Sequence, residues 1–396
     1  MSASFVTFAD LGKKKNLKTA EIFPVIYRFD KEKELDNVIC RIATGFSFKN
    51  TYGSISLFFH FLLKLTELFS GGFFSARRYE EKWCDNKACE KINSINSDIV
   101  FFHPEYFYNR SLLSAKDKSI TTVGLATMAH LGFSAQIEEE ENLILGLSIK
   151  KNRLYNNLLK LNHNLNEFDF VIAYSAFVKN TYIDNGFSAN KIFIAENDID
   201  INNFIPFKKS DSVFRVLYIA NTNILKGLHY LLDAWNSLSL KDAELFLVGG
   251  YSKDISPKLK KLYEEKIKSN NSIKWIGFTN SPEVYYKQTD IFVLPSLTEG
   301  NPRVVMEAMA CGLPIITTEN AKSIVEDGKS GFVVPIRDSA ALQEKIKFLC
   351  YNRDRAEEMG KEARKTVESR KSFSNKVFEI YKEILKRDNI KDSTDE

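Results

Sequence analysis

Apolar segments and helical segments alternate through residues 213–318, and this alternation limits the possible folds more than any other feature of the sequence. Continuous apolar runs predict strands at VFRVLYIAN (213–221), AELFLVGG (243–250), SIKWIG (272–277), DIFVLPS (290–296) and LPIITT (313–318). Helical spacing between these runs predicts helices at 226–238, 257–269, 281–288 and 303–311. Strands that alternate with helices form βαβ units, so this part predicts a parallel, Rossmann-like sheet.

The first half of the chain carries a weaker form of the same pattern. Strand-like runs occur at NVICRI (37–42), DIVFF (98–102), SITTVGL (119–125) and DFVIAYS (169–175). The chain has 396 residues, and single cores stop growing beyond roughly 250–300 residues, so two domains are expected. We predict an N-terminal Rossmann-like domain at 1–205, a second at 206–375, and a C-terminal helix and tail at 376–396 that could cross back to the first.

Composition excludes several classes of protein. The formal net charge is +4, with the excess in the second half, whereas a nucleic-acid binder usually carries a larger basic excess. The five cysteines fit no zinc or disulfide framework and indicate free thiols in a reducing, cytoplasmic setting. The amino-terminal residues lack the pattern of a signal peptide, so none is expected.

One apolar stretch raises the question of a membrane. The segment ISLFFHFLLKLTELF (55–69) is shorter than the roughly 20 apolar residues that a spanning helix needs, and it contains charged side chains. We predict a helix packed within the first domain. A helix at the inner face of a membrane, or one that faces the acceptor, remains the alternative.

Residues 295–331 carry the chemistry. The strand that ends at Pro295 is followed by a polar loop and a helix that begins near Arg303. The first N–H groups of a helix have no partner within it, and at the carboxyl edge of a parallel sheet they form an anion site. Gly300 lets the backbone approach a ligand closely. A diphosphate fits such a site.

Three charged side chains surround this predicted site. Glu299 lies in the loop and Glu307 lies in the helix, and carboxylates beside an anion site are suited to accept hydrogen bonds from sugar and ribose hydroxyls. Lys226 follows another strand and could reach the same phosphate. Taken singly, Glu307 could also be an acid favoured by the helix dipole, and Lys226 a solvated lysine.

The spacing of these residues resembles a known family. The stretch from Glu299 to Glu307 is similar to the E-x7-E motif of the family 4 retaining glycosyltransferases, which have the GT-B fold. The resemblance extends over roughly residues 95–385 and includes the following segments: FDFVIAYSAFVKNTYIDNGF (168–187), AENDIDINNFIP (195–206), ILKGLHYLLDAW (224–235), EAMACGLPIITT (307–318) and EDGKSGFVVPIRD (326–338).

The resemblance implies a role for each matching position on the donor side. Glu299 would hold hydroxyls of the donor sugar, and Glu307 the ribose of the nucleotide. Lys226 would neutralise the diphosphate leaving group. The backbone from Gly300 through Asn301 to Val304 would cradle that diphosphate.

Two further positions extend the predicted site. Phe278, just after the strand SIKWIG, would lie beside the base. His130, within ATMAHLGFSAQIEEEE (126–141), matches a region whose histidine faces the reacting sugar. A purely structural histidine is the alternative for His130, because the local match is loose.

The sequence also departs from the family pattern. Asn221 stands where the family has an arginine that contacts phosphate, Asp198 replaces a glycine, and Ser323 replaces a glutamate. Asp198 and Asp200 form a D-x-D sequence, which elsewhere binds a metal. We interpret it as part of the crossing segment (196–211), which we expect to connect the two domains, because its neighbours fit the family's pattern at 195–206. We expect no metal requirement.

The resemblance predicts a transferase that moves a sugar from a nucleotide-diphosphate sugar to a glycan or lipid-linked acceptor in polysaccharide or cell-surface glycan biosynthesis, with retention of configuration. No cofactor is expected. Arg215, Arg303 or Lys322 could compensate for Asn221. The alternatives are a catalytically silent GT-B nucleotide-binding subunit and a sugar-nucleotide epimerase or phosphorylase-like protein.

Overall fold

The structure is a computed structural model. It describes residues 19–25, 40–42, 85–86, 88–90, 92–93, 99–102, 110–147, 167–207, 209–252 and 255–392. The helix predicted at 55–69 lies outside the described residues. Within the described part, no helix is both long enough and apolar enough to cross a membrane.

The first sheet is parallel, with the strand order β2-β1-β3-β4-β5-β6. Its strands are β1 (Thr19–Val25), β2 (Cys40–Ile42), β3 (Ile99–Phe102), β4 (Thr121–Ala126), β5 (Phe170–Ala173) and β6 (Ile192–Ile194). The helices described between them are α4 (Arg110–Asp117), α5 (Leu131–Ile144) and α7 (Ala176–Ile183). Each strand-like run predicted in this half overlaps a strand, and β1 and β6 are additional.

The second sheet is also parallel, with the order β12-β11-β10-β7-β8-β9. Its strands are β7 (Phe214–Ile219), β8 (Ala243–Val248), β9 (Ile273–Gly277), β10 (Ile291–Leu294), β11 (Ile315–Thr318) and β12 (Gly331–Val334). Its helices are α8 (Leu228–Asn236), α9 (Pro257–Lys268), α10 (Glu283–Tyr286), α11 (Arg303–Ala310), α12 (Ser339–Tyr351) and α13 (Arg353–Glu368). The predicted alternation of strands and helices is confirmed.

One helix start differs from the prediction. The predicted helix at 226–238 is divided into a short 3-10 helix, η5 (Ile224–Lys226), and α8, with Gly227 between them at φ 64°. A Cβ at Gly227 would lie 2.0 Å from the carbonyl oxygen of Pro295. Lys226 therefore ends a turn that packs against the loop after β10, and does not begin α8.

The strand order of the second sheet places a topological switch point between β7 and β10. The chain proceeds outward from β7 through β8 and β9, and then returns to β10 on the other side of β7. Ligands of doubly wound sheets bind at such a point, outside the carboxyl ends of the strands. Lys226 follows β7, and the loop 295–302 follows β10, so the order brings these two segments to the same edge.

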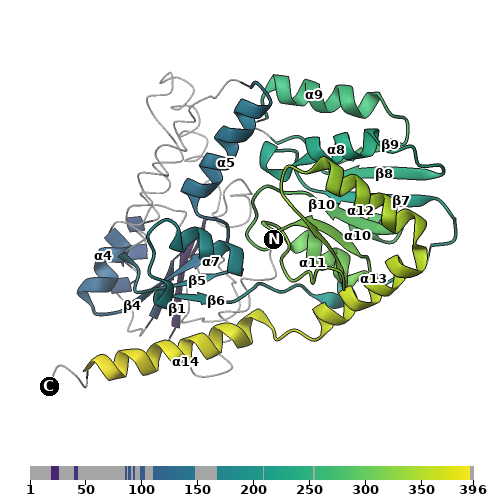
Figure 1. The fold of residues 1–396 in the computed structure, drawn as a ribbon. Helices are drawn as coiled ribbons and strands as arrows, with labels where there is room; N and C mark the ends of the chain where they lie inside the picture. The colour runs from purple at the N-terminus through teal and green to yellow at the C-terminus, as the bar shows by residue number, and fades with distance from the viewer. Residues whose placement is uncertain are drawn as a thin grey trace, which may run out of the picture.

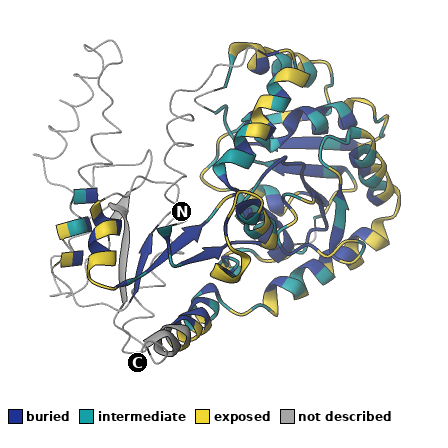
Figure 2. Ribbon diagram, turned by 60° about the vertical axis from the view of Figure 1, so that its left-hand side comes forward, coloured by how far each residue is buried: buried dark blue, intermediate teal, exposed yellow. Residues whose placement is uncertain are grey.

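The last helix returns to the first sheet. α14 (Phe373–Asp392) runs along the first sheet, far from α12, in Figure 1. Its buried face shares a hydrophobic core with β3, β4 and β5; the helix residues in this core are Phe373, Val377, Ile380, Tyr381 and Ile384. Figure 2 shows the strands of the second sheet as buried and the outer faces of its helices as exposed.

Candidate functional site

Lys226 and Glu299 meet at the switch point. The Nζ of Lys226 lies 2.5 Å from Oε1 of Glu299, and the hydroxyl of Ser296 donates to the same oxygen at 3.0 Å. Both charged side chains are largely buried, with exposed fractions of 22% and 12%. The N–H of Leu297 donates to the carbonyl of Leu225 at 2.8 Å, which ties the two loops together. The structure thus pairs a cation with a carboxylate beside the start of α11.

Gly300 packs closely against the backbone of the first domain. A Cβ at this position would lie 1.8 Å from the carbonyl oxygen of Thr127, which follows β4 of the first sheet. The hydroxyl of Ser175, at the start of α7, donates to the carbonyl of Gly300 at 2.7 Å. This position therefore requires glycine because the backbone of the first domain lies so close, whether or not a ligand also approaches it.

The side chain of Asn301 is held by the protein. Its amide donates to Oδ1 of Asn197 in the crossing segment, and its own Oδ1 accepts from the hydroxyl of Ser323. Asn301 is 6% exposed. These contacts occupy the side chain, so the backbone of this residue is the part that remains for a ligand. Ser323 has φ 53°, and its hydroxyl bond stabilises this turn.

Glu307 and Val304 lie on α11 and share a partner. The hydroxyl of Tyr286 is 3.0 Å from Oε2 of Glu307 and 3.3 Å from the carbonyl oxygen of Val304. Burial raises the pKa of Glu307 above its usual range, although the bond from Tyr286 opposes this shift. Tyr286 therefore fixes the orientation of a carboxylate that has lost much of its water.

His130 caps the start of α5. Its ring Nδ1 accepts a bond from the backbone N–H of Gly132 at 3.2 Å, and the backbone N–H of His130 donates to the hydroxyl of Thr181 at 3.0 Å. The ring stands edge-on to Tyr182, with centroids 5.3 Å apart. Burial lowers the pKa of His130 to about 4, so the ring is neutral at pH 7. A neutral ring can donate one hydrogen bond without bringing a charge.

The depressed pKa of His130 predicts a loss of stability in acid. The histidine has a pKa of 6.5 when exposed and about 4 in the fold, so the unfolded chain binds a proton first as the pH falls. The contribution of His130 to the free energy of unfolding is therefore fully present above pH 6.5. It is lost as the pH falls toward 4, by on the order of 3 kcal/mol. His130→Asn keeps a capping acceptor and removes the titrating ring.

We therefore expect the His130→Asn variant to lose less stability than the parent protein between pH 6.5 and pH 4. Urea unfolding at several pH values measures the difference. Parallel pH profiles for the two proteins would show that His130 titrates normally in the fold.

Asn221 and Phe278 lie at the same edge of the sheet, beyond the ends of β7 and β9. Phe278 is 77% exposed, which leaves its ring open to a flat partner. Asn221 is exposed. The proposal that Arg215 fills the place of the missing arginine is wrong. Arg215 lies at the beginning of β7, at the opposite edge, where it is bound to Asp211 and Glu244, each at 2.8 Å.

The two aspartates of the D-x-D sequence make structural contacts. Asp198 accepts a bond from the N–H of Phe373 at 2.8 Å, and Asp200 caps a short turn by accepting from the N–H of Asn202 at 3.1 Å. Among the residues that the structure describes, no group of three histidine, cysteine or acidic side chains could hold a metal ion. That the proposed activity requires no metal stays a prediction.

The sequence did not reveal several contacts of the site. Four residues contact the predicted site residues and hold them in place, although no motif in the sequence marks them: Ser296, Tyr286, Ser175 and Thr127. Their only signal is position, since Thr127 comes directly after the buried strand β4 and Ser296 lies two residues after the buried strand β10. The contact with Gly300 depends on how the two domains meet, which the sequence pattern does not contain.

Sequence comparisons connect the second domain with a known family. Residues 200–366 match the family model described as glycosyl transferases group 1. An uncharacterized glycosyltransferase of Haemophilus influenzae is 32% identical over 43% of this chain and 48% of the relative. The amylovoran biosynthesis glycosyltransferase AmsK of Erwinia amylovora is 29% identical over 44% of this chain and 46% of the relative. The matched region of this chain spans about half the length of these curated relatives.

Structural comparisons cover more of the chain. HepE of Anabaena, in complex with UDP and glucose, aligns with a TM-score of 0.58 and 19% identity over 76% of this chain and 81% of that chain. Sucrose-phosphate synthase of Thermosynechococcus elongatus aligns with a TM-score of 0.62 and 18% identity over 93% of this chain and 88% of that chain. These similarities establish the fold, which is GT-B, with two parallel sheets as the sequence predicts.

Proposed function

We propose that the chain is a retaining glycosyltransferase that transfers a sugar from a nucleotide-diphosphate sugar to a glycan or lipid-linked acceptor. The observation that carries the proposal is the pair of Lys226 and Glu299, 2.5 Å apart at the switch point of the second sheet. A cation suits a phosphate, and a carboxylate suits sugar hydroxyls. The match of residues 200–366 to glycosyl transferases group 1 supports the same reading.

The proposed donor lies along the edge of the second sheet. Its diphosphate sits at the amino end of α11, on the backbone of residues 300–304, with Lys226 beside it. Glu299 accepts hydrogen bonds from the sugar, and Glu307 accepts them from the ribose. The exposed ring of Phe278 lies beside the base.

The proposed reaction needs no protein nucleophile. The bond between the anomeric carbon and the diphosphate oxygen breaks, and negative charge grows on that oxygen. Lys226 and the N–H groups of α11 stabilise this charge in a site with little water. The acceptor oxygen attacks from the same face, and its proton passes to a diphosphate oxygen. His130, neutral because of its low pKa, donates a hydrogen bond to the sugar.

The acceptor belongs to the proposal as well. Relatives of this chain include enzymes named for amylovoran and capsular polysaccharide biosynthesis. We therefore propose polysaccharide or cell-surface glycan assembly at the cytoplasmic side of the membrane, with peripheral contact through the first domain. A silent nucleotide-binding subunit is the second candidate, because Asn221 supplies no charge where the family has an arginine.

Release of nucleoside diphosphate from a panel of nucleotide sugars tests the proposal. We expect release from at least one donor, accelerated by an acceptor glycan and undiminished by EDTA. A silent subunit would bind nucleotide without release, and an epimerase would change the sugar while it remains attached. Loss of release in EDTA with recovery in Mn²⁺ or Mg²⁺ would contradict the metal-free mechanism.

Glu307→Gln is expected to weaken the binding of nucleoside diphosphate by on the order of 1.5–3 kcal/mol, because a neutral amide replaces a charge-assisted acceptor. Since burial raises the pKa of Glu307, binding by the parent protein should also weaken as the pH falls and the carboxylate takes a proton. Calorimetry measures both effects. Equal affinity of the parent and the variant would remove Glu307 from the ribose.

Asn221→Arg is expected to tighten donor binding, by up to about 3 kcal/mol for a hydrogen bond to a charged group. The reason is that Asn221 is exposed at the predicted phosphate edge, and Arg215 cannot reach it. Calorimetry with the intact donor measures the change. Weaker binding would show that another cation already serves this place, and unchanged binding would show that Asn221 does not face the diphosphate.

A further inference from the structure

Glu141 is a fully buried carboxylate at the interface of the two domains. It lies on α5, which follows β4 of the first sheet, and its exposed fraction is 0%. Its Oε2 is 3.0 Å from Nε2 of His229 and 2.9 Å from the hydroxyl of Tyr230, and its Oε1 accepts from Nε of Arg337. All three partners belong to the second domain. A buried carboxylate is costly unless it is paired and hydrogen-bonded, and Glu141 has both kinds of partner.

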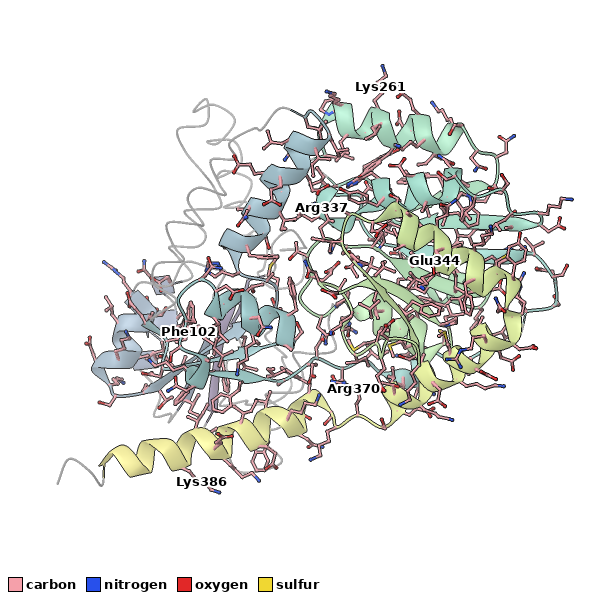
Figure 3. All side chains as sticks on the ribbon, in the orientation of Figure 1. Phe102, Lys261, Arg337, Glu344, Arg370 and Lys386 are labelled. Carbon is pink, nitrogen blue, oxygen red and sulfur yellow. The ribbon has the colours of Figure 1, made fainter. Side chains whose placement is uncertain are left out.

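Further contacts hold α5 against the second domain. Arg337 also donates to Glu140 at 2.8 Å, and Lys258 of α9 donates to the carbonyl of Gly146 at 2.6 Å. Leu147, just past the end of α5, is buried in the hydrophobic core of the second domain. Figure 1 shows α5 rising from the first sheet toward α9, and Figure 3 places Arg337 beside it.

The backbone of Arg337 indicates that this contact is specific. Its φ is 65°, in the left-handed region that non-glycine residues seldom adopt. Such a conformation persists only where surrounding contacts determine it. Here the guanidinium group reaches two neighbouring carboxylates of α5, at Glu140 and Glu141.

The helix that carries Glu141 also connects two residues of the proposed reaction. α5 is capped by His130 at its beginning, and it packs against η5, the turn that ends at Lys226. The distance between the histidine of the first domain and the lysine of the second therefore depends on how firmly α5 is attached. Glu141 is the most buried point of that attachment.

We propose that Glu141 is a positioning residue, which holds α5 on the second domain and so fixes His130 relative to Lys226. This inference rests on the proposed function, because it assigns a role within the same site. Glu141 itself does not touch the donor: it acts through its helix, by anchoring α5 with His229, Tyr230 and Arg337. Loss of the anchor would leave nucleotide binding in place and disturb the geometry of the transfer step.

Glu141→Gln and Glu140→Gln form a matched pair for the test. Both remove one negative charge from α5, but the side chain of Glu140 is 37% exposed. Of the three partners of Glu141 it contacts only Arg337, and its other hydrogen bond comes from Gln136 of the same helix. We expect Glu141→Gln to lower the turnover number by about 10- to 100-fold, as small misplacements of reacting groups do. The donor KM and the affinity for nucleoside diphosphate should stay within about twofold. Glu140→Gln removes only one of the outer contacts of α5, so it should lower the turnover number less than Glu141→Gln does.

Tyr230→Phe is the milder variant, since it removes one hydrogen bond to Glu141 and keeps the charge. Tyr230→Phe replaces Glu141→Gln in the test if that variant does not fold. We expect it to lower the turnover number less than Glu141→Gln would, at an unchanged donor KM. An unchanged turnover number in the folded variant would overturn the inference. A loss of nucleotide affinity equal to the loss of turnover would overturn it too.

Hydrogen exchange separates this inference from the proposed function. Amides of α5 and of residues 224–228 should exchange faster in Glu141→Gln than in Glu140→Gln. If the parent protein releases no nucleoside diphosphate from any donor, the proposed function fails, and the exchange rates still decide whether Glu141 anchors α5. Equal exchange in both variants would contradict the anchoring role.

Discussion

Lys226→Ala is expected to lower the turnover number by roughly 100-fold or more, by analogy with removal of one oxyanion donor. The donor KM should change much less. The ammonium group lies at the switch point, 2.5 Å from Glu299, where the proposed diphosphate leaves. Its charge is most valuable when the leaving group gains negative charge, so the loss falls on the transition state more than on the bound donor. Steady-state kinetics with the best donor measure both constants.

Two controls support this test. Lys226→Ala leaves Glu299 without its cation, and the double variant Lys226→Ala/Glu299→Gln shows whether that unpaired carboxylate causes part of the loss. Lys329→Ala removes an exposed lysine of the same domain, paired with Glu326 at 2.9 Å, and should retain full activity. A rise in donor KM alone would make Lys226 a binding residue and refute its role at the leaving group.

Gly300→Ala is expected to reduce turnover by a comparable factor, roughly 100-fold, because it displaces one domain from the other. The new Cβ would lie 1.8 Å from the carbonyl oxygen of Thr127, closer than any real contact. Either the loop before α11 or the segment after β4 must move, and these two segments carry Glu299 and lead to His130. Turnover number and small-angle scattering of the variant measure the effect on chemistry and on domain arrangement.

Gly360→Ala is the matched control for this substitution. A Cβ there would lie 2.0 Å from the carbonyl oxygen of Gly312, but both residues belong to the second domain. We expect this control to lower Tm without changing the arrangement of the domains. Parental turnover by Gly300→Ala would mean that the observed contact with Thr127 is not part of the active arrangement.

The centre of the second sheet could be predicted from its sequence because β10 and β11 are buried on both faces and β7 and β8 nearly so. Parallel strands covered by helices appear as continuous apolar runs, which are easily distinguished from the helices between them. The strands of the first domain give a weaker sequence pattern. β1 contains a glutamate and a proline, and β6 has three residues, so neither forms a clear run. Their places depend on pairing with neighbouring strands.

The candidate site could likewise be predicted only in part. The proximity of Lys226 and Glu299, which are 73 residues apart, follows from the ends of neighbouring parallel strands meeting at one edge. Glu141 could not be found in this way, because it ends a run of four glutamates, and glutamates are seldom fully buried. Its burial becomes visible only in the fold, where His229, Tyr230 and Arg337 of the second domain surround it. The hypothesis that Arg215 replaces the missing arginine was wrong because Arg215 is the second residue of β7, at the edge of the sheet opposite to Asn221.

The measurement that tests the central claim most directly is proton NMR of a nucleotide sugar incubated with the protein and EDTA. The proposed mechanism predicts that nucleoside diphosphate appears together with a transferred or freshly released sugar whose anomeric configuration equals that of the donor. Nucleotide binding without release from any donor would contradict the claim that this edge of the sheet supports glycosyl transfer. A product of inverted configuration would contradict attack from the face of the leaving group.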